Sequence, residues 1–157
     1  MRKFAFRLER VLQLRKHEEE REKQRLAVLL AELQTARRRQ AACERELAEL
    51  EARFGRALAR SSGDGELAVY ELQLYRGRQE LLRQNLTRAI AKVAEMQQRV
   101  DQQRALLLAA ARRREVLVRL RKRKWEEFQR EVLREEQKLL DEVASVWHYR
   151  QTGLQDA

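Results

Sequence analysis

The sequence feature that most constrains the fold is a repeat of apolar side chains across residues 26–57. Apolar or small residues recur there at alternating spacings of three and four, interrupted once by Gln40. The repeat positions are Leu26, Leu29, Leu33, Ala36, Gln40, Cys43, Leu47, Leu50, Phe54 and Ala57. Because this spacing averages about 3.5 residues, it keeps one face of a helix toward one partner, as in a coiled coil. The same spacing continues back to Leu8 through a polar stretch at residues 15–22.

The composition also favours long helices. The chain has 157 residues, no proline, and 38% charged side chains, a mix typical of coiled coils. The run of serine, glycine and aspartate at residues 61–65 is the one clear turn signal. We therefore predict a single unit, residues 1–157, with helices over about 4–60 and about 66–149 joined by a turn at 61–65. Gly55 lies inside the first helix, at a cost of about 1 kcal/mol relative to alanine.

Two long helices joined by a short turn can pair side by side. The predicted fold is all-α: a long two-helix antiparallel coiled-coil hairpin with a C-terminal helical overhang. An apex at Gly63 gives one possible register, and a register shifted by one heptad fits as well. This apex places Leu33 opposite Val93, Ala36 opposite Ile90, and Glu22 opposite Arg104. The second helix is the longer, so residues beyond about Arg123 have no partner within the hairpin.

Two sets of apolar residues remain uncovered in this hairpin. The overhang carries Trp125, Phe128, Val132, Leu133, Leu139, Leu140, Val143, Val146, Trp147 and Tyr149. Near the turn the apolar residues move to another face, at Leu67, Tyr70, Leu74 and Leu81, with Tyr75 beside them. Uncovered apolar surface indicates a partner, and tryptophan and tyrosine are favoured interface anchors. Alternatives are dimerisation through the overhang, and local packing of the turn-side residues against Phe54 and Leu58.

The positive charge is concentrated in two segments. Residues 1–16 hold six basic residues and one acidic residue, and residues 112–124 hold eight and one, in a chain of net charge +10. An antiparallel hairpin brings the two segments together at its open end, where they need an acidic partner. Nucleic acid, an anionic membrane surface and an acidic collar on a protein all qualify. A protein is favoured because it uses the charge and the exposed aromatics together, and no nucleic-acid-binding motif is present.

The sequence predicts no enzyme. His17 and His148 lie in opposite halves, and no glycine-rich phosphate-binding loop or zinc-ligand spacing occurs. No catalytic residue, metal site, cofactor or small-molecule substrate is therefore expected. The longest apolar run, residues 106–111, is far too short to span a membrane. The start of the chain lacks a secretory signal, so we expect a cytoplasmic protein.

The start of the sequence carries a family resemblance. The run from Phe4 to Arg15, FAFRLERVLQLR, is followed by glutamates at 18 and 19. It is similar to the opening F-x-F-R-L-E-x-V-L-x-L-R of the flagellar export protein FliJ family. The two-helix layout, the short turn and the basic stretch before a tryptophan-containing second half extend the resemblance over nearly the whole chain.

The resemblance implies a component of the flagellar type III export apparatus, and with it flagellum biogenesis, motility and chemotaxis. Family members form a coiled coil similar to the central stalk of rotary ATPases. Their partners are the hexameric export ATPase, the membrane export gate protein and the export chaperones, so the implied location is the cytoplasmic face of the membrane, reached through those partners.

The resemblance and the exposed residues together give two candidate binding surfaces. The gate surface near the turn comprises Phe54, Leu67, Tyr70, Leu74 and Tyr75. The ATPase-ring surface at the open end comprises Arg7, Arg10, Arg119, Arg121, Arg123, Trp125, Phe128, Val132, Leu139 and Trp147. Tyr75 matches a family aromatic, whereas Gln79 stands where the family tends to have leucine. Two alternative functions stay open: the stalk of a virulence type III secretion system, and a basic coiled-coil nucleic-acid-binding protein.

Overall fold

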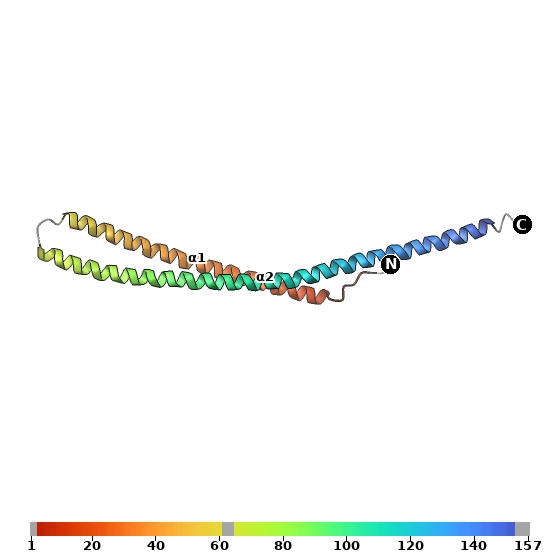
Figure 1. The fold of residues 1–157 in the computed structure, drawn as a ribbon, viewed down its shortest axis with the longest axis horizontal. Coiled ribbons are helices and arrows are strands. Elements are labelled where there is room, and N and C mark those ends of the chain that lie inside the picture. The colour runs from red at the N-terminus through yellow and green to blue at the C-terminus, as the bar shows by residue number, and fades with distance from the viewer. Residues whose placement is uncertain (1–2, 61–64, 153–157) are drawn as a thin grey trace. The chain divides into compact units, whose positions relative to one another are not determined.

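The protein consists of two long helices in a computed structural model, which describes residues 3–60 and 65–152, with side chains for 3–60 and 69–148. Helix α1 spans Glu9–Arg60 and helix α2 spans Gly65–Thr152. The two helices run in opposite directions and pack against each other (Figure 1). The all-α antiparallel hairpin is confirmed, while residues 61–64 of the expected turn lie outside the described residues.

Packing divides the chain into two units. Unit 1 comprises Met1–Glu19 and Ala110–Ala157, and unit 2 comprises Glu20–Ala109. Each unit therefore contains a part of both helices rather than one continuous stretch of chain. The core of such a unit forms between residues that lie far apart in the sequence.

The core of unit 2 is a small cluster between the helices. Leu33 and Ala36 from α1 pack with Met96 and Val100 from α2, and Val100 is completely buried. Leu26, Leu29 and Val93 pack around this cluster, each half-buried. Large side chains lie beside the small Ala36, which is how two helices interlock at a narrow seam.

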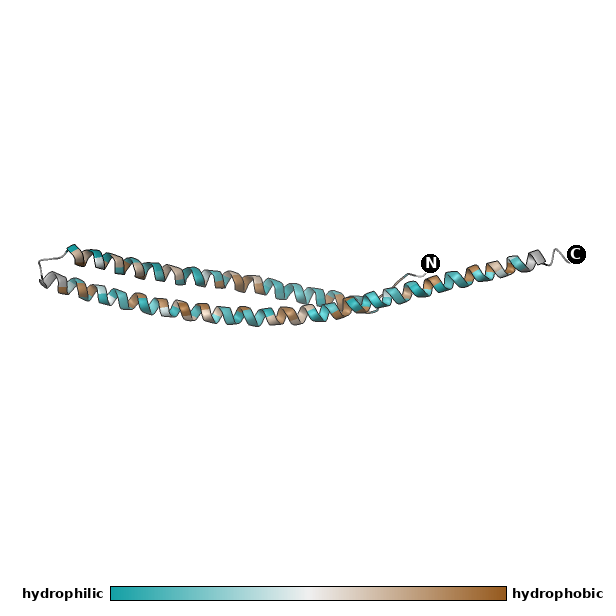
Figure 2. Cartoon of the chain, turned by 45° about the horizontal axis from the view of Figure 1, so that its top comes forward, coloured by the Kyte–Doolittle hydropathy of each residue, from teal (hydrophilic) through white to brown (hydrophobic). Residues whose placement is uncertain are grey.

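The predicted apolar repeat of α1, which we call the seam, is confirmed over most of its length. Every seam position from Leu12 to Phe54 is buried or half-buried, including the polar Arg15, Glu19, Glu22 and Gln40. The two ends of the predicted repeat, Leu8 and Ala57, are exposed. Figure 2 shows the corresponding alternation of hydrophobic and hydrophilic residues along both helices.

The apex register predicted for α2 is wrong at Ile90, Arg104 and Val118, which are exposed, whereas its other positions from Leu86 to Arg114 are buried or half-buried. Buried or half-buried residues outside the predicted register include Ala89, Met96, Gln103, Ala110 and Leu117. Leu33 packs with Met96, and Ile90, expected opposite Ala36, is exposed. Placing the apex at Gly63 assumes that residues equally far from Gly63 along the two helices face each other. The observed register instead follows the side chains that best fill the space between the helices.

The polar part of the seam is held by hydrogen bonds. In unit 2, the Gln103 side-chain amide donates to the carboxylate of Glu22 and to its backbone carbonyl oxygen, 3.3 Å away. Arg104, expected opposite Glu22, pairs instead with Asp101 of its own helix at 3.2 Å. In unit 1, the Arg114 guanidinium donates to the Glu19 carboxylate. Polar partners at such seam positions restrict the register, because any shift leaves buried polar groups without hydrogen bonds.

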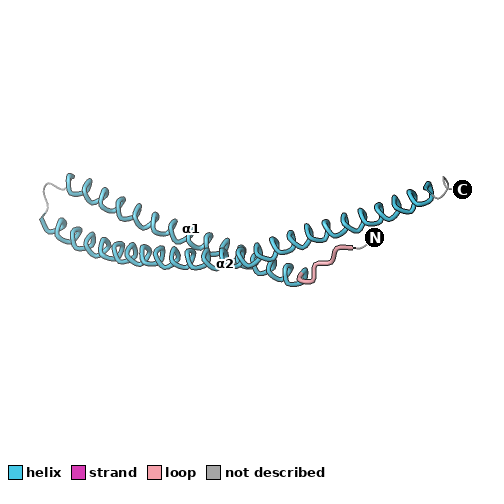
Figure 3. Tube along the Cα trace, turned by 45° about the vertical axis from the view of Figure 1, so that its right-hand side comes forward, coloured by secondary structure: helices cyan, strands magenta, loops and turns pink. Residues whose placement is uncertain are grey.

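Helix α1 begins at Glu9, five residues later than the predicted start near Phe4. Residues 3–8 form a loop (Figure 3), in which the Glu9 amide donates to the Phe6 carbonyl at 3.0 Å. The Phe4 ring packs against aromatic side chains of α2. This tertiary packing outweighs the helical propensity of the first residues.

Replacing Gly55 with alanine should stabilise the protein. Gly55 lies inside α1, and a Cβ added there meets no atom within 4 Å. Alanine adopts helical backbone angles at a lower entropic cost, so Gly55→Ala should raise the free energy of unfolding by about 0.5–1 kcal/mol. Urea unfolding followed by circular dichroism measures the change. A decrease would show that this part of α1 is not an ordinary helix.

Candidate partner-binding surfaces

The aromatic cluster of unit 1 joins the N-terminal segment, residues 3–8, to α2. The Phe4 ring lies edge-on to Trp125, with ring centroids 5.0 Å apart, and 5.7 Å from Phe128. Trp125 and Phe128 are themselves 5.9 Å apart. Such pairs contribute about 0.5–1.5 kcal/mol beyond burial. Pairing between the N-terminal part and α2 therefore extends past Arg123, and the predicted overhang begins after Phe128.

A groove of about 830 Å³ lies between this N-terminal segment and α2. Phe6, Leu120 and Phe128 contribute apolar surface, while Lys124 and Glu127 line its polar part. The Lys124 ammonium lies 2.6 Å from the Glu127 carboxylate. The hydrogen bond from Lys124 lowers the pKa of Glu127, and the same bond raises the pKa of Lys124. The pair therefore stays charged across the neutral range.

The five predicted basic residues differ in their pairing. All five are exposed. Arg121 pairs with Glu9 of α1 at 3.2 Å, and Arg119 pairs with Glu115 one helical turn away. Arg7, Arg10 and Arg123 make no ion pair within the described residues, so these three keep their charge available at the surface.

The C-terminal part of α2 carries an exposed apolar stripe. Of the predicted residues there, Val132 is half-buried, while Leu139 and Trp147 are exposed. Further residues on the same face are exposed as well: Leu133, Leu140, Val143 and Val146. We call residues 132–147 of this face the C-terminal stripe. Apolar surface of this extent on one helix is expected to be covered by a partner.

Removing the Phe4 ring should uncover Trp125. Phe4→Ala deletes the edge-on contact that covers part of the indole, so the Trp125 emission maximum should shift to longer wavelength. The measurement requires a Trp147→Phe background, because the chain has two tryptophans. Phe54→Ala in the same background is the matched control and should leave the emission unchanged. An unchanged spectrum in the Phe4 variant would contradict the packing of the N-terminal segment.

A second exposed stripe lies on α2 near its start. Tyr70, Leu74 and Leu81 are all exposed and follow one face at spacings of four and seven residues; we call them the tip stripe. Gly77 falls on the same face, and a Cβ added there meets nothing within 4 Å. The side chain of Leu67, also predicted here, lies outside the described side chains. Because glycine carries no side chain, a partner backbone can approach this part of the tip stripe closely.

The other two residues of the predicted gate surface pack against each other. The rings of Phe54 on α1 and Tyr75 on α2 are stacked, with centroids 3.9 Å apart and planes inclined by 16°. The Gln79 amide donates to the Tyr75 hydroxyl at 3.1 Å and to Glu51 of α1 at 3.3 Å. Gln79 thus occupies the seam where an apolar residue is usual. Phe54 and Tyr75 hold the helices together and position the tip stripe.

Phe4 is a residue of the candidate surface of unit 1 that the sequence prediction missed. It anchors the N-terminal segment on two residues predicted to bind a partner, Trp125 and Phe128. The signal available in the sequence was an aromatic residue that precedes Leu8, the first position of the apolar repeat. Nothing in the 3-4 spacing indicates that such a residue folds back onto the second helix.

Within the described residues, no group of three or more His, Cys, Asp or Glu side chains is arranged to hold a metal ion. Over the same part of the chain, no helix is both long and apolar enough to cross a membrane. The candidate partner-binding surfaces are the aromatic cluster with its arginines, the C-terminal stripe and the tip stripe.

Comparisons with known proteins point to one family. A family model described as flagellar FliJ protein matches residues 4–153, nearly the whole chain. Searches of curated proteins and of solved structures returned no match. Membership of this family implies a component of the flagellar type III export apparatus. From its two-helix fold and the match over almost its full length, the chain belongs to the flagellar FliJ protein family.

Proposed function

We propose that this protein is a non-enzymatic stalk of the flagellar export apparatus, which links the hexameric export ATPase to the membrane export gate. The ATPase ring binds the aromatic cluster, the neighbouring arginines and the C-terminal stripe. The gate binds the tip stripe. The chain also escorts unloaded export chaperones and reaches the cytoplasmic side of the membrane through these partners.

The observation that carries the proposal is the exposed C-terminal stripe. Leu139 and Trp147 are each more than half exposed on a helix that has no partner there among the described residues. Burying them in a protein interface releases about 25 cal/mol per Å² of apolar surface. Tryptophan and arginine are also the residues most often found at the energetic centres of interfaces.

The charged residues favour a protein partner over nucleic acid. Arg119, Arg121 and Lys124 are already paired with carboxylates. Phosphate binding depends on a continuous cationic surface and weakens steeply with salt. Arg7, Arg10 and Arg123 make no ion pair within the described residues, and Arg7 lines the groove of unit 1 together with Phe6 and Phe128. Such a mixed surface suits an acidic rim on a protein.

A bridging experiment tests the proposal. The cytosolic domain of the cognate gate protein is immobilised, and the export ATPase is added with or without the full chain. We expect the ATPase to be retained only when the chain is present, and to stay bound in part at high salt. Leu74→Glu on the tip stripe should abolish retention of the chain by the gate but leave its binding to the ATPase intact.

The matched control is Leu30→Glu, the same change at an exposed leucine of α1 outside both stripes. It should bridge as the unmodified chain does. Failure of the unmodified chain to bind either component would overturn the proposed function. Equal loss for Leu74→Glu and Leu30→Glu would overturn the assignment of the tip stripe to the gate.

A further inference from the structure

A groove in unit 2 runs along one side of the contact between α1 and α2. It consists of two hollows, of about 650 and 470 Å³, which share Val28. Along α1 it extends from Arg21 to Arg39, about 27 Å at 1.5 Å per residue. On α2 its lining residues fall between Arg88 and Gln103. We call it the lateral groove, and its length corresponds to about five helical turns.

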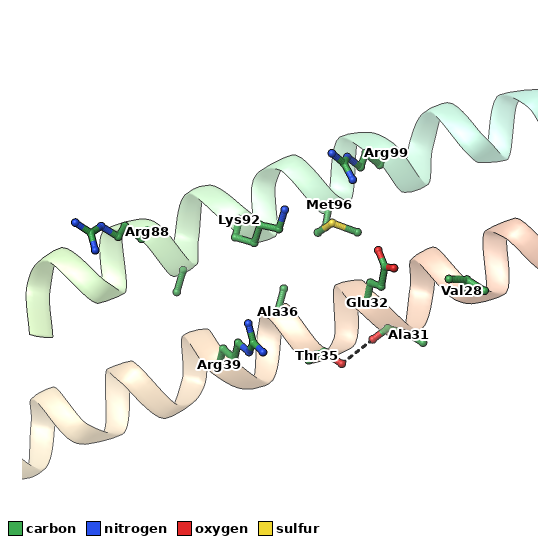
Figure 4. Close-up of a pocket in the computed structure, with 11 residues that line it drawn as sticks. Val28, Ala31, Glu32, Thr35, Ala36, Arg39, Arg88, Lys92, Met96 and Arg99 are labelled. Carbon is green, nitrogen blue, oxygen red and sulfur yellow. Dashed lines mark hydrogen bonds between the residues drawn. The ribbon is translucent and has the colours of Figure 1, made fainter.

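The floor of the lateral groove is apolar. Figure 4 shows Ala36 and Met96 pointing into the space between the helices, and both side chains are buried. Beside them, Val28 is 58% exposed, and Ala31 and Thr35 are exposed as well. Small side chains between two helices leave room for the side-chain ridge of a third helix.

The walls of the lateral groove are cationic. Glu32 is the one acidic residue among the described residues that line the two hollows, and the basic ones are Arg21, Arg25, Arg39, Arg88, Lys92 and Arg99. Arg25 pairs with Glu22 at 2.8 Å, while Lys92 and Arg99 both pair with Glu95, at 2.8 and 2.7 Å. Arg21, Arg39 and Arg88 form no ion pair in the described part of the chain. Three guanidinium groups of the walls are therefore available to an acidic partner.

Two of these guanidinium groups flank the same end of the 650 Å³ hollow. Because α1 and α2 run in opposite directions, Arg39 and Arg88 lie toward one end of it, and Val28 and Arg99 toward the other (Figure 4). One arginine comes from each helix, so an occupant with carboxylates on both of its edges meets a guanidinium on each side. Such charge-assisted hydrogen bonds are stronger than those between neutral groups.

We propose that the lateral groove binds an acidic amphipathic helix of a partner protein. The apolar face of that helix packs on Val28, Ala31 and Met96, and its acidic edges lie against Arg39 and Arg88. Its apolar residues recur at spacings of three and four, with glutamate or aspartate on both sides of them. None of the groove residues belongs to the aromatic cluster, the C-terminal stripe or the tip stripe, so the proposal does not depend on the stalk function.

Charge and floor together favour a helix over nucleic acid. A phosphate backbone would satisfy the arginines but leave the apolar floor without a matching surface. Of the described residues that line the two hollows, none is aromatic, so the groove lacks the platforms on which unpaired bases stack. An acidic amphipathic helix covers the floor and the charged walls at once.

Fluorescence anisotropy of a labelled synthetic peptide tests the proposal with the full chain and no export component. The peptide is a helix of about 18 residues, matched to the groove length. Leucines follow one face, glutamates follow both edges of that face, and glutamines fill the rest. We expect the full chain to bind it at least about tenfold more tightly than a peptide with lysine in place of every glutamate.

Variants of the chain locate the binding site. Arg39→Glu with Arg88→Glu should weaken binding of the acidic peptide at least about tenfold and shift the preference toward the lysine peptide. The matched control is Arg38→Glu with Arg83→Glu, the same charge change at exposed arginines outside the groove, which should leave binding unchanged. A gain of lysine-peptide binding requires a folded groove, and circular dichroism checks the helical content of each variant.

Three results would overturn the proposal. The first is that the unmodified chain binds neither peptide, or binds both equally. The second is that the groove and control variants lose the same affinity. The third is that a labelled single-stranded DNA of equal charge binds more tightly than the acidic peptide and is lost in the groove variant, which would assign the groove to nucleic acid. Because the ATPase and the gate are absent, none of these results bears on the stalk function.

Discussion

Leu33→Ala is expected to destabilise the protein by about 2–4 kcal/mol. Leu33 is 4% exposed and lies at the centre of the cluster with Ala36, Met96 and Val100. Truncation leaves a cavity that two helices held by a narrow seam cannot easily close. Since small proteins are stable by only about 5–15 kcal/mol, this is a large share of the total. Urea unfolding followed by far-ultraviolet circular dichroism measures the loss.

Leu30→Ala is the matched control for this experiment. Leu30 lies on the same helix, one turn away, but is 40% exposed and outside the cluster. It should lose less than about 1 kcal/mol, because part of its surface already faces water. Similar losses for the two leucines would mean that the seam of α1 does not face α2 as described.

The second large effect is expected on binding to the export ATPase. Leu139→Glu places a carboxylate in the middle of the C-terminal stripe, and burying that charge in an interface is costly. We expect the affinity for the cognate ATPase to fall at least about tenfold, or about 1.4 kcal/mol. Fluorescence anisotropy of the labelled full chain, titrated with ATPase, gives the affinity.

Leu108→Glu controls for the change in charge and hydrophobicity. Leu108 is exposed on α2 to a similar degree as Leu139 but lies outside the C-terminal stripe. Its variant should bind the ATPase normally. If both variants bind with unchanged affinity, the ring contacts another part of the chain; if both lose affinity equally, the contact is not specific to the stripe.

The seam of α1 could be read from the sequence because its periodicity is an intrinsic property of one helix. The spacing from Leu26 to Phe54 fixes which face is apolar, whatever the partner. The antiparallel hairpin followed from the same pattern, the absence of proline and the single turn signal. These predictions did not require knowing which residue of α1 packs against which residue of α2.

The register of α2 could not be read in the same way. Ile90 and Met96 are both apolar and belong to overlapping 3-4 repeats, so periodicity alone does not choose between them. The choice depends on which side chain fits beside Leu33 and Ala36. Gln103, a polar residue, takes a covered position because Glu22 offers it a hydrogen-bond acceptor. Such pair preferences appear only when both helices are present.

The candidate surfaces were predictable as sets of apolar residues, but not in their local packing. Tyr70 and Leu74 are exposed as expected, whereas Tyr75, next in the sequence, stacks on Phe54. Trp125 was expected on an unpaired helix and is instead partly covered by Phe4. A side chain that folds back from a loop leaves no periodic signal, so these contacts required the three-dimensional structure.

The most direct test of the stalk function is the rate of ATP hydrolysis by the cognate export ATPase as the full chain is added. An asymmetric two-helix stalk inside a six-fold ring contacts the subunits unequally, and it should promote ring assembly and bias the catalytic cycle. We predict that the hydrolysis rate rises and saturates once each ring holds one chain, and that Leu139→Glu prevents the rise. A rate unchanged at concentrations where the chain is fully bound would contradict the proposed function.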